Sequence, residues 1–261
     1  MGWFLAGQAI ASEYTFPYRE QFAAVGVSFI EKDTLAENLD DYVVIDARER
    51  LEYDTIHIEG AHSIPFSSRN FSRDVRELAG STDKPLVFYC NGRACSVSYR
   101  AVEYAQSLGL EQVYAYDLGI LPWAERYPQY TMLHGEVLQA HPSGLIANNA
   151  FNNRNLPEQR FFEFIERDNN PLVLDVRSNR QRDGISLYYR DVHLPLDRSD
   201  DEILALVDQA IDEQRTVFVI DDAGHQTRWV QHLFEDRGLE NYWFLEGGAV
   251  AVFDNMQLPS G

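Results

Sequence analysis

The chain has 261 residues, of which 45% are hydrophobic, and its 22 basic and 41 acidic side chains give a formal net charge of −19. This length suits one large or two ordinary domains, and the hydrophobic content is sufficient for a core. The acidic surface makes nucleic acid and anionic membrane surfaces poor partners, and no window reaches the ~20 apolar residues of a membrane span.

The first segment, residues 1–26, is predicted to be an extension ahead of the first domain. Its start, MGWFLAGQAIASEY, has a short apolar stretch but lacks a basic region and is interrupted by Gly7 and Gln8. These features do not fit an intact signal peptide. We therefore expect a cytoplasmic protein; the alternative is a periplasmic protein whose leader has been trimmed.

Apolar runs and helical stretches alternate through the first half of the chain. Gly109 is placed to end a helix, because glycine readily adopts the backbone conformation that follows a helix C-terminus. Such alternation is typical of a parallel sheet covered by helices on both faces. The predicted elements are a helix at 32–39, a strand ending at Asp46, a strand at 86–89, a helix at about 98–108 and a strand at 113–116.

The same order of elements returns in the second half. YVVIDARE at 42–49 returns as PLVLDVRS at 171–178, SLGLEQV returns as DRGLENY, and YDLGI returns as LEGGA. Three matches at one offset are hard to obtain by chance, so the sequence predicts a tandem repeat of two homologous domains. The pairs that lie 129 positions apart are Asp46 and Asp175, Gly109 and Gly238, and Gly119 and Gly248.

We therefore expect an α/β fold with two tandem domains, each a parallel sheet flanked by helices. The Asn-rich stretch NNAFNNRNLP predicts an exposed linker between them. The expected boundaries are a catalytic domain at 27–128, a linker at 129–156 and a second domain at 157–258. In the second domain the predicted elements are helices at 157–167 and 227–236 and strands ending at Asp175 and covering 216–220 and 242–245.

Both cysteines of the chain, Cys90 and Cys95, lie in the loop CNGRACS between a strand and a helix. Two cysteines make neither a disulfide scaffold nor a four-ligand zinc site. Backbone N–H groups at a helix N-terminus attract an anion, and Arg93 adds a positive charge. Gly92 suits a tight curl. The loop thus favours a thiolate at Cys90, the nucleophilic form, over the alternative of a buried structural cysteine.

Several motifs of the first half occur together: VVIDARERLEY, IHIEGAHSIPF, the YC pair with its loop, and DLGILPW. The set resembles the rhodanese (sulfurtransferase) superfamily, in a subtype with Cys-Asn-Gly followed by a second cysteine. The resemblance implies that Cys90 takes a sulfane sulfur from a small anionic donor such as thiosulfate and passes it, as a persulfide, to a thiol or cyanide acceptor or to a protein acceptor.

By the same resemblance, the loop amides surround the charge on Cys90, Arg93 orients the donor, and Arg48 either meets the substrate or pairs with Asp46. No cofactor is expected. No metal is expected either, because His57 and His62 have no further ligands at suitable spacing in the sequence. The expected substrate-binding residues are Asn91, Gly92, Arg93, Ala94, Cys95, Ser96 and Arg48.

The second half has no thiol at the corresponding position. Counting forward from its Val-Phe strand places Ile220 opposite Cys90, whereas counting back from Gly238 places Asp221 there. Either way this half is predicted to be inactive, with a loop one or two residues shorter. Asp221, Asp222 and His225 also permit a metal or acid–base site, although a degenerate loop with solvated carboxylates is favoured.

Three other functions remain as alternatives. The Cys90 and Cys95 pair permits a thiol redox or sensor protein. The acidic second domain permits a non-enzymatic binding module. A phosphatase is disfavoured, because it needs an arginine six residues after the cysteine, where this chain has Ser96.

Overall fold

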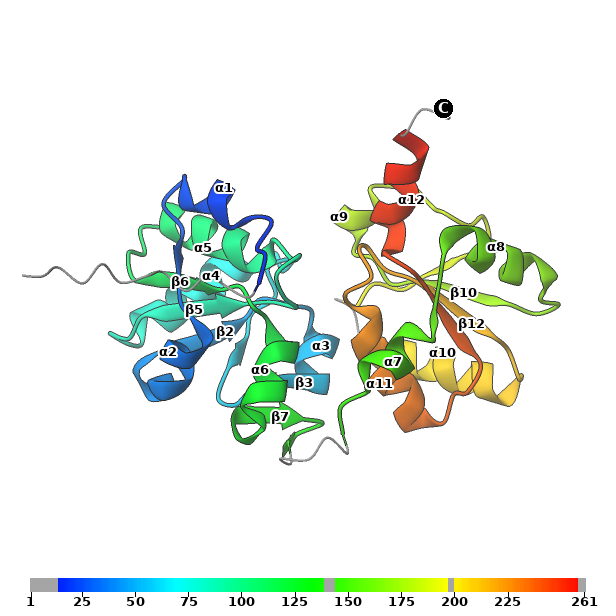
Figure 1. Ribbon diagram of the computed structural model, residues 1–261, viewed down its shortest axis with the longest axis horizontal. Helices are drawn as coiled ribbons and strands as arrows, with labels where there is room; N and C mark the ends of the chain where they lie inside the picture. The colour runs from blue at the N-terminus through cyan, green and yellow to red at the C-terminus, as the bar shows by residue number, and fades with distance from the viewer. Residues whose placement is uncertain (1–13, 139–143, 197–199, 258–261) are drawn as a thin grey trace, which may run out of the picture.

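The structure is a computed structural model and describes residues 14–138, 144–196 and 200–257. These residues form two halves that lie side by side, each built around a five-stranded sheet (Figure 1). No helix in the described ranges has both the length and the apolar character needed to cross a bilayer. The N-terminal stretch that was considered as a signal peptide includes residues 1–13, which lie outside the described residues.

The sheet of the first half has the strand order β1-β6-β5-β2-β4, and all of its pairs are parallel. The four residues of the central strand β5 are all buried, which explains the continuous apolar run in the sequence. The strands are β1 (Ser28–Phe29), β2 (Val43–Asp46), β4 (His62–Ser63), β5 (Leu86–Tyr89) and β6 (Val113–Tyr116).

Helices cover both faces of this sheet, and successive residues of β5 pack on opposite sides. Phe88 packs in one cluster with Val75 and Val102, whereas Val87 packs in the other cluster with Leu35 and Ile120. The α-helices of this half are α1 (Arg19–Ala23), α2 (Lys32–Glu37), α3 (Arg50–Thr55), α4 (Phe71–Gly80), α5 (Val97–Ser107) and α6 (Ile120–Arg126).

The sheet of the second half has the order β9-β13-β12-β10-β11, again with parallel pairs throughout. Position by position this is the order of the first sheet, so the α/β fold with two parallel sheets agrees with the prediction. The strands are β9 (Asn155–Leu156), β10 (Leu172–Asp175), β11 (Val192–His193), β12 (Val217–Ile220) and β13 (Tyr242–Leu245). The helices are α7 (Asn148–Asn152), α8 (Glu158–Arg167), α9 (Asn179–Arg182), α10 (Asp200–Asp212), α11 (Thr227–Arg237) and α12 (Gly248–Gln257).

The residue pairs of the sequence repeat occupy equivalent places in the two halves. Each aspartate is the last residue of a strand, and each glycine of the second pair follows a helix with positive φ. Each glycine of the third pair stands at the start of the last helix of its half. The pairs are Asp46 in β2 and Asp175 in β10, Gly109 after α5 and Gly238 after α11, and Gly119 before α6 and Gly248 in α12.

Two segments contribute more to the fold than the sequence predicts. The predicted extension contains α1, where the buried Phe22 stacks on Tyr99 and Arg19 forms an ion pair with Asp117 at 2.7 Å. The predicted linker is not simply exposed. A 3-10 helix (Pro128–Tyr130) overlaps its start. The linker then contains β7 (Thr131–Leu133) and β8 (Glu136–Val137), which form a small antiparallel sheet with β3 (Ile56–Ile58), and it also contains α7 and β9.

Apolar side chains of each half pack into the other half where α3 contacts α11. Leu51 of α3 belongs to a hydrophobic cluster of the second half, and Trp229 of α11 belongs to a cluster of the first half. Both side chains are buried. The boundary between the two halves is therefore a packed apolar contact.

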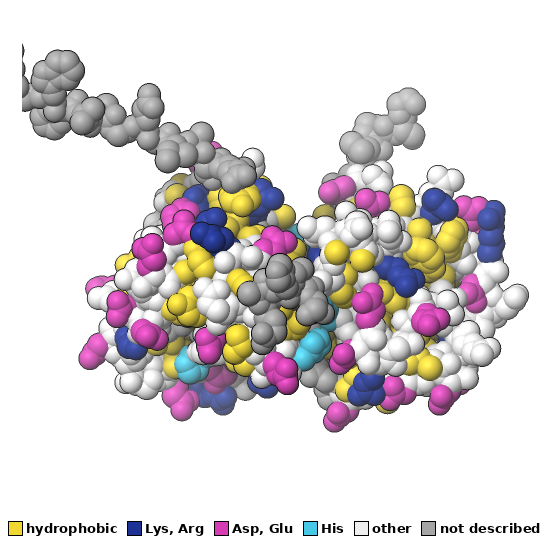
Figure 2. All heavy atoms as spheres, turned by 60° about the horizontal axis from the view of Figure 1, so that its bottom comes forward, with side chains coloured by type: hydrophobic (Ala, Val, Ile, Leu, Met, Phe, Trp, Pro, Cys, Tyr) yellow, Lys and Arg dark blue, Asp and Glu magenta, His cyan; other side chains and the backbone are white. Residues whose placement is uncertain are grey.

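Acidic side chains are scattered over both halves on the face shown in Figure 2, in keeping with the net charge of −19. Histidine side chains are visible on this face near the boundary between the halves. An anionic ligand must therefore find a local cluster of donors that overcomes the repulsive field of the whole molecule.

Candidate active site

Cys90 directly follows β5, at the carboxyl end of the first sheet, where ligands of open parallel sheets bind. Residues 91–96 form the loop that leads from Cys90 to α5. The side chain of Cys90 is buried, and its Sγ lies 3.6 Å from the carbonyl oxygen of Cys95 and 3.6 Å from Oγ of Ser98.

Two opposing effects act on the Cys90 thiol. Burial raises its pKa, but hydrogen bonds with the Cys95 side chain, with the backbone of Gly92 and Ser98 and with the Ser98 hydroxyl lower it. The net pKa of Cys90 is below that of an ordinary thiol. This direction agrees with the prediction that the loop favours a thiolate.

The Cys95 thiol shifts in the opposite direction. Its hydrogen bond to Cys90, together with burial, raises the pKa of Cys95 well above the ordinary value. Cys95 therefore stays protonated and donates to the Cys90 sulfur when Cys90 is ionised. Both cysteines are free thiols in this structure.

Glycine is required where the loop meets the start of α6. Gly119 has φ +88°, and a Cβ at this position would lie 2.3 Å from the Cα of Gly92. Gly92 itself has φ +154°. The Ile120 amide also donates to the carbonyl oxygen of Cys90 at 3.2 Å. The start of α6 thus packs directly against the backbone of the curled loop. A residue with a side chain at position 119 would clash with that backbone.

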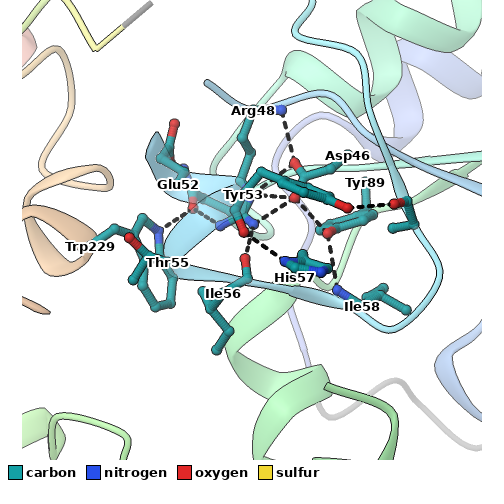
Figure 3. Close-up of polar contacts among 12 residues, drawn as sticks. Asp46, Arg48, Glu52, Tyr53, Thr55, Ile56, His57, Ile58, Tyr89 and Trp229 are labelled. Atoms are coloured by element: carbon teal, nitrogen blue, oxygen red, sulfur yellow. Dashed lines mark hydrogen bonds and ion pairs between the residues drawn. The ribbon is translucent and has the colours of Figure 1, made fainter. Parts of the chain in front are cut away.

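Arg48 is fixed by Asp46 (Figure 3). Its Nε lies 2.9 Å from Asp46 Oδ1 and its Nη2 lies 2.6 Å from Asp46 Oδ2, and Nη2 also donates to the Ile56 carbonyl oxygen at 2.5 Å. Tyr89 donates its hydroxyl to Asp46 Oδ2 at 2.5 Å. Of the two roles that the sequence left open for Arg48, the structure shows the pairing with Asp46, and the same arrangement links Arg177 to Asp175.

Arg93 lies apart from the Cys90 sulfur. Its side chain is exposed, its guanidinium lies 5.1 Å from the centre of the Tyr14 ring, and its Nη1 lies 3.4 Å from the Thr15 carbonyl oxygen. Neither Arg93 nor Gly92 lines the cavity at Cys90. The orientation of a donor by Arg93 stays a prediction without support from this geometry.

A cavity of about 300 Å³ opens at Cys90 between the two halves. Cys90 and Arg48 contribute to it from the first half, as do four further residues of the loop. The second half forms the opposite wall. The loop residues are Asn91, Ala94, Cys95 and Ser96, and the wall includes Ser178, Arg180, Gln181, Asp222, His225 and Gln226.

Asn91, the residue after Cys90, is held by both halves. Its Nδ2 donates to Oε1 of the buried Glu52 at 2.6 Å, and its Oδ1 accepts from Nε1 of Trp229 at 2.6 Å and from Nη1 of Arg48 at 3.4 Å. Gln226 donates to the other oxygen of Glu52 at 3.1 Å. Burial raises the pKa of Glu52, although Arg48 and the two amide side chains oppose this. In Figure 3 the Trp229 indole reaches toward Glu52 and Arg48 from the second half.

The loop of the second half presents Asp221 where the first half presents Cys90. Ile220 pairs with Asp175 as Tyr89 pairs with Asp46, so counting forward to Ile220 was wrong by one residue. The Asp221 carboxylate accepts the Gly224 amide at 2.8 Å and the Gln226 amide at 2.9 Å. Its loop, residues 222–226, is one residue shorter than the first, within the predicted range.

Within the described residues, no cluster of three or more histidine, cysteine or carboxylate side chains is arranged to hold a metal ion. His57 instead donates from Nδ1 to the Tyr53 carbonyl oxygen at 2.7 Å and stacks on the Tyr53 ring. The exposed His62 lies in β4. Both histidines therefore have placements that do not require a metal.

Sequence reasoning missed Glu52, Gln226 and Trp229. A capping box over Glu49 and Glu52 was visible as two glutamates three residues apart, but it indicates only a helix start. Trp229 and Asn91 are 138 residues apart in the sequence. No pattern within either half signals a contact between them.

The fold and site thus define an α/β protein with a low-pKa cysteine in a loop at the carboxyl edge of a parallel sheet. Residues 31–126 match the protein family described as the Rhodanese-like domain. The first half of the chain is therefore similar to this family. No curated protein matches the chain.

Several solved structures resemble this one. A rhodanese-related protein from Thermoplasma volcanium is 29% identical over 38% of this chain and 92% of its own, with a TM-score of 0.31. The BH2092 protein from Bacillus halodurans is 23% identical over 45% of this chain and 85% of its own, with a TM-score of 0.37. A thiosulfate sulfurtransferase from Pseudomonas aeruginosa is 18% identical over 88% of this chain and 45% of its own, with a TM-score of 0.35.

Proposed function

We propose that this protein is a sulfurtransferase in which Cys90 carries a sulfane sulfur as a persulfide. One observation carries the proposal: Cys90 directly follows the central strand and begins a curled loop whose hydrogen bonds lower its pKa despite complete burial of the side chain. A thiolate held in this way is the form that attacks sulfur. The similarity of the first half to the Rhodanese-like domain family supports the same chemistry.

The reaction has two balanced steps. In the first, the Cys90 thiolate attacks the outer sulfur of thiosulfate, a new S–S bond forms, the S–S bond of thiosulfate breaks, and sulfite leaves with the electron pair. In the second, a nucleophilic acceptor attacks the outer sulfur of the persulfide and the Cys90 thiolate leaves. Loop amides that stabilise the anionic sulfur in both steps act as preorganised electrostatic donors.

The two halves have different roles in this proposal. Residues 27–128 form the catalytic domain, and residues 157–258 form a second copy of the fold that has Asp221 in place of the nucleophile. The equal strand order of the two sheets and the equivalent Asp-x-Arg pairs support the repeat. The segment between them connects the copies while it also completes the small sheet with β3.

Thiocyanate production from thiosulfate and cyanide tests the proposal directly. The wild-type protein is expected to form thiocyanate at a rate proportional to its concentration, and Cys90→Ser is expected to form none above the blank. A Cys90→Ser variant that turns over like the wild type would overturn the role of Cys90. A wild type without activity toward thiosulfate or any other sulfane donor would overturn the proposed function itself.

A redox role for the Cys90–Cys95 pair is the second candidate, favoured by the hydrogen bond between the two side chains. The raised pKa of Cys95 argues against it, because a protonated thiol is a poor attacking group. Treatment with a mild oxidant and measurement of the mass separate the two: a disulfide across the loop is expected for a redox pair, and no mass loss is expected for a sulfur carrier.

A further inference from the structure

A second cavity, of about 660 Å³, lies next to the cavity at Cys90. The two cavities are adjacent because they share four lining residues, and together they are called the groove, with Cys90 in its inner part. The outer part lies over α4 and α5 of the first half and is bordered by α9 of the second half. The shared residues are Phe66, Ser67, Arg100 and Arg180.

Three arginines line the outer cavity from three separate elements. Arg69 lies just before α4, Arg100 lies in α5 and Arg180 lies in α9. None of them forms an ion pair with any carboxylate of the described residues, and Arg100 instead lies 5.1 Å from the centre of the Phe66 ring. One carboxylate, Glu103, lines the outer cavity. Such a cluster of unpaired cations is conspicuous in a chain of net charge −19.

The dimensions and remaining lining of the groove fit an organic anion better than an inorganic one. Serine hydroxyls at Ser68, Ser72 and Ser107 offer further hydrogen bonds, and Phe71 offers an apolar surface. Pockets of roughly 300–1,000 Å³ hold small organic ligands. The inner cavity alone has room for thiosulfate, so the outer cavity is free for a larger molecule.

Resting on the proposed function, we propose that this groove binds the anionic tail of a low-molecular-weight thiol that accepts the sulfur from Cys90. Arginine suits carboxylate and phosphate groups because its planar fork makes two parallel hydrogen bonds. With the tail on the arginines, the acceptor thiolate faces the Cys90 persulfide. It attacks the outer sulfur, a new S–S bond forms, the bond to Cys90 breaks, and the electron pair stays on the Cys90 thiolate. No external oxidant or reductant is required.

Acceptor kinetics test the groove on the full-length protein. With thiosulfate as donor, the acceptors are glutathione with an anionic tail, 2-mercaptoethanol without one, and cyanide. The variant Arg69→Gln, at an arginine that lines only the outer cavity, is expected to raise the KM for glutathione by about tenfold, as the loss of a charge-assisted hydrogen-bonded pair implies, and to change the constants for 2-mercaptoethanol and cyanide less than about twofold. Arg76→Gln, an exposed arginine of α4 that lines neither cavity, is the matched control.

Equal KM values for glutathione in Arg69→Gln and in the Arg76→Gln control would overturn the proposed binding of the acceptor tail. Binding of S-methylglutathione to Cys90→Ser, measured by calorimetry, keeps this test separate from the proposed function. Binding that weakens when Arg69→Gln is added to Cys90→Ser supports the groove even if no sulfur transfer occurs, and an absence of binding to Cys90→Ser contradicts it.

A different observation concerns the second half. We infer that Trp229 and Gln226 are positioning residues for the Cys90 loop. The Trp229 indole donates to Asn91 Oδ1 at 2.6 Å, and Gln226 donates to the same Glu52 that accepts from Asn91. Because Asn91 directly follows Cys90, these contacts fix the first turn of the loop. A half of the chain that has lost its own thiol thereby completes the site of the other half.

Trp229→Phe tests this inference because it removes the indole N–H and keeps an aromatic ring in the buried position. The midpoint of the pH profile for Cys90 alkylation is expected to move to higher pH, and kcat for thiocyanate formation is expected to fall by about tenfold, the effect of one buried hydrogen bond. Trp243→Phe, in β13 of the same half, is the matched control. An alkylation midpoint of Trp229→Phe equal to that of the Trp243 control, in a folded protein, would contradict the inference, and this readout does not depend on sulfur transfer.

Discussion

The two loops that follow β5 and β12 share a frame and differ in the group that they hold. In both, a residue with an ionisable side chain directly follows the strand, and an amide in the first turn of the last helix, that of Ile120 or Ala249, donates to the carbonyl oxygen of this residue. In the first loop this group is the Cys90 thiol, which lines the cavity between the halves. In the second loop it is Asp221, whose two oxygens already accept loop amides.

The two loops share a requirement for glycine at the start of the last helix of their half. The close approach of Gly119 to the first loop has its counterpart in Gly248, where a Cβ would lie 2.6 Å from the backbone of Asp222. Both loops therefore require glycine at the same place. In the second loop, which is one residue shorter, Asp221 stands in place of the cysteine, and its carboxylate accepts the loop amides of Gly224 and Gln226.

The largest effect is expected at Cys90. Cys90→Ser retains the size of the side chain and a hydrogen-bond donor but removes the nucleophilic sulfur, so sulfur transfer is expected to fall to the blank while the fold is kept. Thiocyanate formation and circular dichroism measure the two properties. Cys95→Ser is the matched control, since it removes the neighbouring thiol and is expected to retain transfer. Loss of sulfur transfer in Cys95→Ser but not in Cys90→Ser would contradict Cys90 as the nucleophile.

A pH effect is expected where the halves meet, at His232 of α11. Burial lowers the pKa of His232 to about 4, with nearby His134 and Arg228 acting in the same direction and Asp236 against it. In the unfolded chain a histidine has a pKa of ~6.5, so the unfolded state binds the proton more readily between these values. The contribution of His232 to the free energy of unfolding is therefore fully present above pH ~6.5. It decreases by up to about 3 kcal/mol as the pH falls toward 4.

Urea unfolding between pH 7 and pH 4.5 measures this contribution. Other groups titrate in the same range, so the comparison is between wild type and His232→Gln. The variant is expected to lose less stability on acidification, because it has no imidazole to protonate. Parallel pH profiles for the two proteins would show that His232 does not contribute.

A smaller effect is expected in the second loop. Asp221→Asn replaces one of the two accepting oxygens by an amide group that faces a backbone donor, at a buried site. The expected cost is about 1–3 kcal/mol in the free energy of unfolding. Asp254→Asn, an exposed aspartate of α12, is the control and is expected to be neutral within about 0.5 kcal/mol. Equal stability of the two variants would mean that the second loop is not held by its carboxylate.

Several strands, and the start of the helix that follows the Cys90 loop, were predictable because they depend on the local pattern of apolar and polar residues. The strands at 86–89, 113–116 and 242–245 have the predicted bounds, since each is a short apolar run between polar residues. The helix predicted over 32–39 ends at Glu37, and a separate 3-10 helix follows at Leu39–Asp41. At that boundary Asn38 leaves the helical conformation, with φ −130° and ψ 33°, and its Nδ2 donates to the Thr34 carbonyl oxygen at 2.9 Å.

Contacts between distant segments were not predictable. The contribution of α1 depends on the Arg19–Asp117 pair, which joins residues 98 apart, and the link between Trp229 and Asn91 spans 138 residues. The one-residue error at Ile220 has a different cause. The Val-Phe pair occurs in both halves but occupies different positions in the strands, and only the pairing of Leu172 with Val217 establishes the register.

The intact mass of the protein after incubation with thiosulfate reports the covalent state of Cys90 without any acceptor. We expect a gain of one sulfur atom, about 32 Da, on the wild type and on Cys95→Ser, and no gain on Cys90→Ser. A gain on Cys90→Ser, or a wild type that instead loses about 2 Da by forming a disulfide across the loop, would contradict Cys90 as the sulfur carrier.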